Sequence, residues 1–312
     1  MSDIINEIAS KHLGKAGDGT VVKPYVTPDS VDKSLLVGVP RVLNRTQYDI
    51  KEDDLPFVGT DAWNAYEFST LLDNGFPVSG VLKLTYPADS VNIVESKSIK
   101  LYLNSFNMMK NGKTVEQVRK NVIDQVRKDL TECVQCDGRE LWVNLFLDED
   151  TKIVAPPILR EYNYLETSVD VESMEFPFYN ENPDILKIVD SDGKPQRWRS
   201  NSLRSNCRVT NQPDWGDVYV YIKGGKTVTP ESLLQYIVSM RKENHFHEEV
   251  CECMYKRLYD LAKPDELMVT CLYTRRGGID INPVRATSVD LAKREARTLL
   301  NAFAFCEKTA RQ

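Results

Sequence analysis

The feature that most constrains this chain is the order of its apolar patterns between residues 217 and 273. Residues 217–222 and 267–273 are short runs of apolar and aromatic side chains typical of strands. Between them, residues 229–231 (Thr-Pro-Glu) combine a capping hydroxyl, a first-position proline and an acid that suits a helix start. A second helix is predicted at 247–262. The segment therefore predicts a strand, two helices and a strand.

Residues 82–145 repeat this order more loosely. Residues 82–86 and 100–103 alternate in strand fashion, and residues 139–145 return to a strand pattern. A helix is predicted at 114–132. Thr114 and Gln117 form a capping-box signature, and one apolar face follows at Val115, Val118, Val122, Val126 and Leu130. Two such blocks without alternating βαβ units predict the α+β class, with antiparallel strands and helices on one face.

Composition narrows the functional classes. Hydrophobic residues make up 41% and charged residues 28%, which excludes wholesale disorder. The net charge of −6 argues against non-specific nucleic-acid binding. No apolar run is long enough to suggest a membrane span, and residues 1–7 lack the apolar core of a signal peptide, so the cytoplasm is expected. Seven scattered cysteines favour free thiols over a disulfide framework.

The first candidate for chemistry is Cys207, in the polar segment 205–216. Small and polar neighbours keep this thiol accessible, and Arg208 could favour the thiolate, the form that attacks electrophiles. Asp214 follows a proline that turns the chain, so a loop could bring its carboxyl beside the target of the thiol. An idle loop cysteine with a turn aspartate is the alternative, and spacing alone favours it.

The second candidate is the segment 94–100, which carries a carboxylate, two hydroxyls and two amines. In an extended segment, Glu95 and Lys97 would share one face and Ser96 would lie on the other. A glutamate can accept hydrogen bonds from a guanine-like edge, and a lysine can meet a phosphate. On these residues alone, a solvated edge strand is the favoured interpretation.

Two further clusters lie in the second half. Residues 245–249 place histidines, Phe246 and two acids at a helix start, where they could orient or stack on a heterocycle. Residues 273–285 place paired arginines beside Gly277 and Gly278, which allow close backbone approach to an anion such as a 2′-phosphate. An ordinary interhelical turn and a basic strand end explain them equally well. No Gly-x-Gly-x-x-Gly opens a βαβ unit, which argues against a Rossmann site.

The cysteine pairs Cys133–Cys136 and Cys251–Cys253 could in principle bind zinc. A strong zinc pattern has two matched pairs at finger or ribbon spacing. Here Cys251 falls on the apolar stripe of the helix, and Cys253 falls on another face. The sequence therefore predicts no metal.

Taken together, the four clusters resemble one family, the QueF-type nitrile reductases. The matching segments are residues 95–106, 205–216, 243–248 and 274–283. Their order, signature half first and nucleophile half second, is that of the two-module subgroup, and the resemblance covers roughly residues 55–285. The chain departs from the family pattern in four places: a longer N-terminal arm, a long connection at 148–198, Val284 in place of an aromatic, and an added helix near 291–300.

The resemblance implies tandem tunnelling-fold modules, each an antiparallel sheet backed by a helix pair, in a homodimer. We expect an arm or cap at 1–54, a first module at 55–165, and a second module with the added helix at 166–312. The implied reaction is reduction of a small deazapurine, 7-cyano-7-deazaguanine, to its aminomethyl form with two NADPH, in queuosine biosynthesis and tRNA modification. Neither a membrane nor a nucleic acid is an expected direct partner.

The resemblance also implies residue roles. Cys207 would attack the nitrile carbon to form a thioimide, Asp214 would protonate the nitrogen, and His247 would bind substrate and transfer protons. The implied substrate residues are Val94, Glu95, Ser96, Phe246, His247 and Glu248. The implied NADPH residues are Ser96, Lys97, Arg276 and Gly277.

Two rival functions remain open on the sequence. A related amidinotransferase branch keeps the nucleophilic cysteine but adds ammonia and needs no NADPH. A non-catalytic deazapurine-binding protein would have no use for Cys207 or Asp214. The intact segment 95–100 and the arginine–glycine pair favour the reductase.

Overall fold

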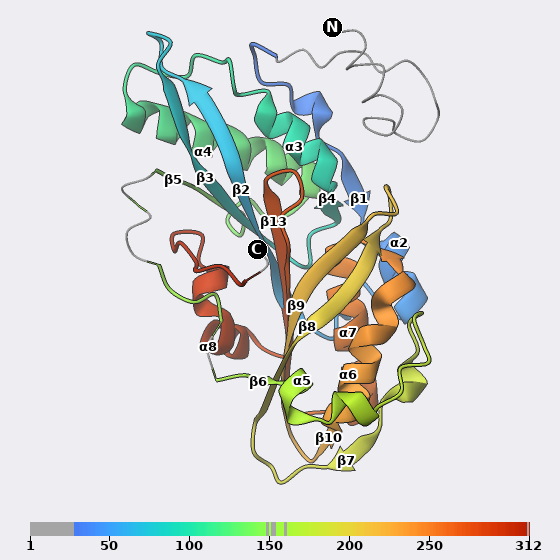
Figure 1. Ribbon diagram of the computed structural model, residues 1–312. Helices are drawn as coiled ribbons and strands as arrows, with labels where there is room; N and C mark the ends of the chain where they lie inside the picture. The colour runs from blue at the N-terminus through green and yellow to red at the C-terminus, as the bar shows by residue number, and fades with distance from the viewer. Residues whose placement is uncertain (1–27, 148–149, 151–153, 159–160, 311) are drawn as a thin grey trace, which may run out of the picture.

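One large sheet runs through the computed structural model, which describes residues 28–147, 150, 154–158, 161–310 and 312 (Figure 1). Its strand order is β11-β8-β9-β12-β13-β2-β3-β5, with β6 paired to β8 beside this path. All pairings are antiparallel except the short β11–β8 and β6–β8 contacts, which are parallel. The strands are β2 (Val58–Leu71), β3 (Pro77–Pro87), β5 (Trp142–Phe146), β6 (Asn163–Tyr164), β8 (Gln196–Cys207), β9 (Pro213–Lys223), β11 (Asn244–His245), β12 (Glu266–Tyr273) and β13 (Ile279–Ala286).

The two halves of the chain meet at one strand pair. β13 of the second half pairs along its full length with β2 of the first half, from Ile279 opposite Ala65 to Ala286 opposite Val58. The antiparallel strands of the two halves are therefore joined into one sheet, and the predicted α+β class is confirmed.

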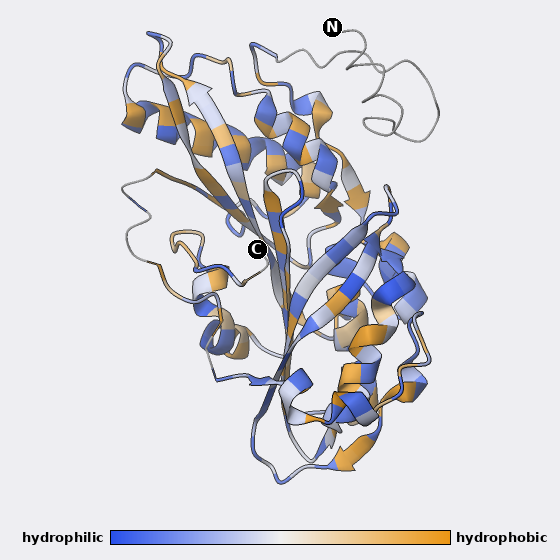
Figure 2. Cartoon of the chain, in the orientation of Figure 1, coloured by the Kyte–Doolittle hydropathy of each residue, from blue (hydrophilic) through white to orange (hydrophobic). Residues whose placement is uncertain are grey.

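In the first half, α3 (Ser96–Asn104) and α4 (Val115–Val134) cover one face of the sheet. The α4 helix begins as predicted, because the Thr114 hydroxyl accepts the N–H of Gln117 at 3.2 Å. Its predicted apolar face is buried at Val118, Val122, Val126 and Leu130, whereas Val115, the first helical residue, is exposed. Figure 2 shows hydrophobic and hydrophilic residues alternating around α4, as expected of a helix with one face on a sheet.

The strand predicted at 100–103 is wrong, because this segment belongs to α3. The Glu95 carboxylate caps the helix by accepting the N–H groups of Lys97 and Ser98 at 3.0 and 2.7 Å. The buried side chains Ile99, Tyr102 and Leu103 are spaced at three and four residues, so they share one helical face. A short apolar run does not by itself distinguish a helix from a strand.

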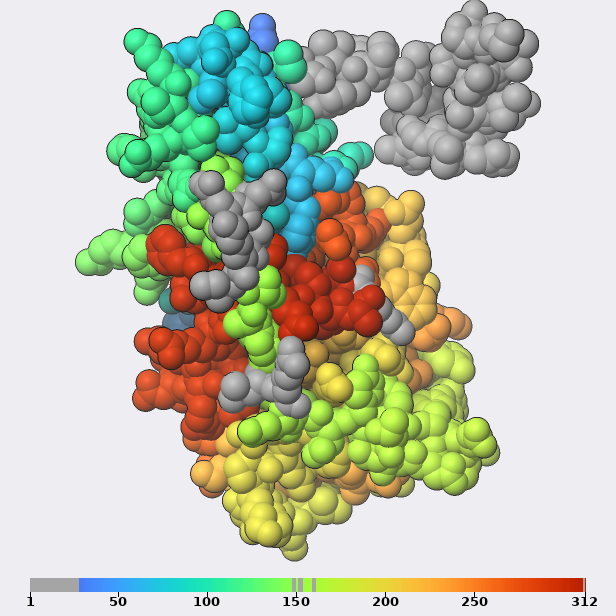
Figure 3. Space-filling model, turned by 60° about the vertical axis from the view of Figure 1, so that its left-hand side comes forward, coloured from blue at the N-terminus to red at the C-terminus, as the bar shows by residue number. Residues whose placement is uncertain are grey.

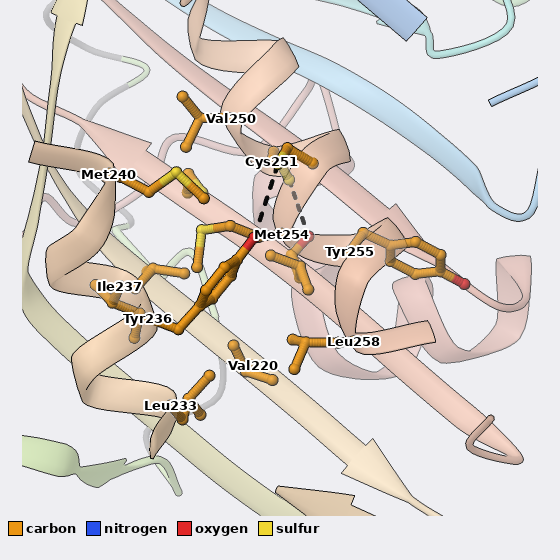
Figure 4. Packing of buried hydrophobic residues seen from close by; sticks show 14 of the residues in the cluster. Val220, Leu233, Tyr236, Ile237, Met240, Val250, Cys251, Met254, Tyr255 and Leu258 are labelled. Carbon is orange, nitrogen blue, oxygen red and sulfur yellow. Dashed lines mark hydrogen bonds between the residues drawn. The ribbon is translucent and has the colours of Figure 1, made fainter. Parts of the chain in front are cut away.

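In the second half, the two predicted helices α6 (Pro230–Ser239) and α7 (His247–Ala262) back β8, β12 and β13. Thr229 caps α6 and accepts the N–H of Ser232. Figure 4 shows the core between these helices and the sheet, where side chains of α6 and α7 interdigitate: Leu233, Tyr236, Ile237, Val250, Met254 and Leu258. Cys251 and Cys253 are buried in this core, and no group that could hold a metal is found in the part of the chain that the structure describes.

The helix expected near 291–300 is α8 (Val289–Leu300), which covers the opposite face of the sheet over β2, β12 and β13. It packs through Leu291 and Leu299 against a separate apolar cluster that includes Val284, the residue that departs from the family pattern. Figure 3 shows the C-terminal segment in red between the cyan first half and the yellow second half. The added helix therefore contacts strands of both halves on the face of the sheet opposite α6 and α7.

The described part of the N-terminal segment also joins the halves. β1 (Gly38–Pro40) pairs with β4 (Asn92–Val94), and α2 (Val42–Arg45) follows it. Arg45 donates to both oxygens of Glu252 on α7 at 2.8 Å, while Arg41 pairs with Asp61 on β2 at 2.5 Å. Residues 1–27 of the predicted arm lie outside the described residues.

Smaller elements complete the chain: η1 (Lys33–Leu35), η2 (Thr46–Tyr48), α5 (Leu165–Ser168), η4 (Val171–Ser173), η5 (Pro183–Ile185), β7 (Ile188–Asp190), β10 (Lys226–Val228) and η6 (Met240–Lys242). Within the described residues, no helix is long and apolar enough to span a membrane.

Candidate active site

A cavity of about 320 Å³ opens where the two halves meet. All eleven residues singled out from the sequence line it: Val94, Glu95, Ser96, Lys97, Cys207, Asp214, Phe246, His247, Glu248, Arg276 and Gly277. The wall also contains residues to which the sequence assigned no role: Trp63, Lys100, Val209, Thr210, Gln212, His245, Ile279 and Ile281. The first half contributes the start of α3, and the second half contributes the β8–β9 turn, the start of α7 and the β12–β13 turn.

Cys207 is the last residue of β8, at the tip of the β8–β9 hairpin. Its N–H donates to the carbonyl of Gln212 at 2.8 Å, and its carbonyl accepts the N–H of Asn211 at 2.9 Å. This closed turn directs backbone N–H groups towards the sulfur. Partial burial disfavours the thiolate, but hydrogen bonds from the Thr210 side chain and from the backbone of Thr210 and Val209 outweigh it and lower the pKa of Cys207.

The expectation that Arg208 favours the thiolate is not supported by its contacts. Arg208 instead donates to Asn44 at 2.8 Å and pairs with Glu249 at 3.1 Å. The cation beside Cys207 is Arg276, from the β12–β13 turn. Arg208 follows Cys207 along the chain, but it is the first residue of the turn after β8, and its side chain extends towards α2 and α7.

Asp214 lies on β9 opposite Ser205, two residues before Cys207, and is almost fully buried. Its Oδ1 accepts a hydrogen bond from Arg276 at 2.6 Å, and its Oδ2 lies 3.4 Å from Nε2 of His247. Burial alone would favour the neutral acid. The contacts with His247 and Arg276 reverse this and hold the pKa of Asp214 below its ordinary value.

His247 is the first residue of α7, and its ring packs against an aromatic side chain of β12. The imidazole lies against the Tyr273 ring with centroids 3.9 Å apart and planes inclined by 31°. This fixes Nε2 towards the Asp214 carboxylate, so the histidine, the acid and the thiol meet along one wall of the cavity.

Glu248 lies at the inner end of the cavity and is 3% exposed. Burial, followed by the charge of Asp61, raises the pKa of Glu248 to about 8. Among the described residues, its Oε1 and the indole Nε1 of Trp63, which lines the same cavity, have no hydrogen-bond partner. Buried polar atoms without partners are costly, so this end of the cavity suits a heterocycle that carries both donors and acceptors.

Glu95 stands at the cavity wall in a different situation. Both carboxylate oxygens are used in capping α3, through the N–H groups of Lys97 and Ser98. Its first function in the folded chain is to hold the start of α3, and with it Ser96 and Lys97, at the mouth of the cavity. Phe246, the residue before α7, lies at the same wall with the Arg208 guanidinium 5.9 Å from its ring.

The mouth of the cavity is basic, and a ligand can approach the backbone of a glycine turn there. Lys97 and Lys100 on α3 face the β12–β13 turn, in which Gly277 and Gly278 have φ values of 59° and 75°. The positive φ favours glycine at 277, and a Cβ there would stand 2.6 Å from Nζ of Lys100 and displace that lysine. Two lysines, an arginine and a glycine backbone fit the phosphates of NADPH.

Comparison with known proteins bears on this site. A model described as nitrile reductase, 7-cyano-7-deazaguanine-reductase N-terminal, matches residues 27–141, and one described as QueF-like protein matches residues 213–290. The NADPH-dependent 7-cyano-7-deazaguanine reductase of Colwellia psychrerythraea strain 34H is 39% identical over 270 residues, 85% of this chain and 90% of that protein. The chain belongs to the 7-cyano-7-deazaguanine reductase family. The resemblance inferred from the four clusters is thereby confirmed.

A solved structure of the archaeosine synthase QueF-Like in the apo form is a more distant match to this nitrile reductase family member. It shares 18% identity, covers 33% of this chain and 95% of its own, and has a TM-score of 0.27. A likeness of that extent adds nothing to the argument about the site.

Proposed function

We propose that this chain reduces the nitrile of 7-cyano-7-deazaguanine to an aminomethyl group with two NADPH, in queuosine biosynthesis. The observation that carries the proposal is the position of Cys207, a thiol of lowered pKa in a cavity built from both halves, between Asp214 and an unsatisfied buried glutamate. The name of the 39% identical relative states the same activity for that protein.

The first step forms a bond between the Cys207 sulfur and the nitrile carbon. One π pair of the triple bond moves to nitrogen, which takes up a proton, and the product is a thioimide. Asp214 begins as a carboxylate, takes the proton of the thiol and delivers it to the nitrogen, so the step balances within the site. Covalent attachment converts a poor hydride acceptor into an activated C=N bond.

NADPH, when bound, supplies the two hydrides. Ser96, Lys97, Arg276 and Gly277 hold its phosphates at the basic mouth of the cavity. His247, ordered by Tyr273 and next to Asp214, supplies protons to the substrate nitrogen during reduction. Cys207 leaves the carbon as a thiolate, a departure that its low pKa favours.

Recognition of the deazaguanine ring falls to the inner end of the cavity. The Glu248 carboxylate accepts the paired N–H groups of the guanine-like edge, and binding therefore requires this group to lose its proton. Val94, Ser96 and Phe246 line the space around the ring, and Glu95 orders the α3 start beside it.

The rival functions are separated by a turnover assay. The purified chain is mixed with the nitrile and NADPH, with and without ammonia, and both NADPH oxidation and the product mass are followed. The proposal predicts two NADPH oxidised per nitrile and an aminomethyl product that does not depend on ammonia. An amidine formed from ammonia without NADPH use would identify the amidinotransferase, and ligand binding without conversion would identify a binding protein.

We further propose that the protein acts as a homodimer in the cytoplasm. The free state of its cysteines fits a reducing compartment. Sedimentation equilibrium on the full chain should give a mass of two chains, and a mass of one chain would contradict the dimer.

A further inference from the structure

Arg276 makes contacts that binding a cofactor does not require. One guanidinium nitrogen donates to Asp214 Oδ1 at 2.6 Å, and the other donates to Thr210 Oγ1 at 3.1 Å and to Gln212 Oε1 at 2.6 Å. All three acceptors belong to the β8–β9 hairpin that carries Cys207. The arginine therefore reaches from one hairpin to another, where it contacts the turn that follows Cys207 and the carboxylate of Asp214.

The backbone fixes this reach. Arg276 N–H donates to Ile279 O at 3.0 Å, and the return bond from Ile279 N–H to Arg276 O is 3.3 Å, so the two residues close a tight turn over Gly277 and Gly278. The neighbouring Arg275 points elsewhere, with its guanidinium 4.4 Å from the centre of the Tyr66 ring. Two adjacent arginines thus have separate positions, and only Arg276 lies at the cavity wall.

The charges around Cys207 show why a cation is needed at this point. The Asp214 carboxylate opposes ionisation of the thiol, since two like charges would stand close together in a partly buried site. Burial alone would lower the pKa of Arg276, but hydrogen bonds and charge attraction from Asp214 and then Cys207 raise it. The guanidinium thus interacts with both anions.

We infer that Arg276 is a positioning residue of thioimide formation, which holds the Asp214 carboxylate beside the Cys207 sulfur and favours the thiolate that forms as the thiol proton passes to Asp214, before any cofactor is bound. The inference rests on the proposed function and adds a role to the one that places Arg276 on the cofactor phosphates. A residue that only binds NADPH has no effect on a step that proceeds without NADPH. This difference makes the two roles separable.

The experiment measures adduct formation with the nitrile in the absence of NADPH, by quenching at intervals and weighing the intact chain. Wild type is compared with Arg276→Gln and Arg276→Lys, and Arg275→Gln is the matched control one residue away. The pH midpoint of Cys207 alkylation by iodoacetamide is measured on the same proteins. The charged and titratable groups that line the cavity with Cys207 are Glu95, Lys97, Lys100, Asp214, His245, His247, Glu248 and Arg276.

Loss of one close opposite charge should move the alkylation midpoint of Arg276→Gln by about one pH unit or more to the alkaline side and slow adduct formation about tenfold at neutral pH. Arg276→Lys should recover part of both, and Arg275→Gln should match wild type. Adduct formation by Arg276→Gln at the wild-type rate with an unshifted midpoint, alongside a raised KM for NADPH, would overturn the inference. If Arg276→Gln does not fold, the lysine variant supplies the same comparison. An absence of any adduct in wild type would instead refute the proposed function.

Discussion

Replacing Glu248 by glutamine should make the ligand-free protein less sensitive to alkaline pH. In the folded chain, burial and the charge of Asp61 raise the pKa of Glu248 from its ordinary 4.5 to about 8. The folded state therefore holds this proton more tightly than the unfolded state does. The carboxyl contributes its full stabilisation below about pH 4.5, and this contribution is lost as the pH rises through about 8.

The size of the effect follows from the shift. Between about pH 6 and about pH 9 the unfolded glutamate stays ionised, while the folded one passes from protonated to ionised. At about 1.36 kcal/mol per unit of pKa difference, wild type should lose roughly 2–3 kcal/mol of unfolding free energy through this residue over that interval. The buried Glu248 carboxyl therefore destabilises the ligand-free protein mainly at alkaline pH, where it ionises.

Urea denaturation of wild type and Glu248→Gln at both pH values measures this directly. Every other titrating group is common to the two proteins and cancels in the comparison of their pH-dependent losses. Glu248→Gln should lose roughly 2–3 kcal/mol less than wild type on going to the higher pH. An equal loss in both proteins would refute the reasoning that Glu248 is protonated at neutral pH in the empty cavity.

Two further perturbations test other parts of the account. Asparagine at position 214 cannot take the thiol proton, so Asp214→Asn should form the adduct about 10²–10⁴-fold more slowly in the absence of NADPH, as measured by intact mass. Cys207 should still react with iodoacetamide in this variant. An adduct rate like that of wild type would contradict the role of the acid. Glu252→Gln removes a carboxylate that accepts from Arg45 and Arg285 at 2.8 Å in a fully buried cluster, and should lower the unfolding free energy in urea by about 3–5 kcal/mol. The control Glu266→Gln breaks a half-exposed pair with Arg294 and should cost about 0–1 kcal/mol, and similar losses in both would show that the buried cluster has no special weight.

The elements that could be predicted from the sequence are those whose signals are local. The α7 bounds match at both ends because an acidic first turn and a regular apolar stripe mark the helix between 247 and 262. The α3 helix was mistaken for a strand because its run is short, and its start depends on Glu95 folding back on the backbone. β13 gave no clear apolar alternation, since Asp280, Asn282 and Arg285 are all buried within it. Asp280 and Arg285 find partners in distant parts of the chain, at Asn64 and at Asp61 and Glu252.

The candidate site shows the same limit. The resemblance assigned roles to eleven residues, and the structure brings these eleven to one cavity, although Arg208 points elsewhere and other lining residues such as Trp63 and His245 had no assigned role. The sequence could not show whether Arg208 or Arg276 lies near Cys207, because this depends on how the β8–β9 and β12–β13 hairpins are placed relative to each other. It also could not show that the backbone of Val209 and Thr210 supports the sulfur, or that the segment around Arg41 and Arg45 is buried between the halves.

The central claim is that the sulfur of residue 207 bonds to the carbon of a nitrile. Intact-mass measurement after adding 7-cyano-7-deazaguanine alone tests it most directly, with Cys207→Ala as the control. Wild type should gain the mass of one nitrile molecule, lose it again when NADPH is added, and release the aminomethyl product, while Cys207→Ala should gain nothing. Turnover by the alanine variant, or product formed by wild type with no trapped adduct at any time, would contradict the account.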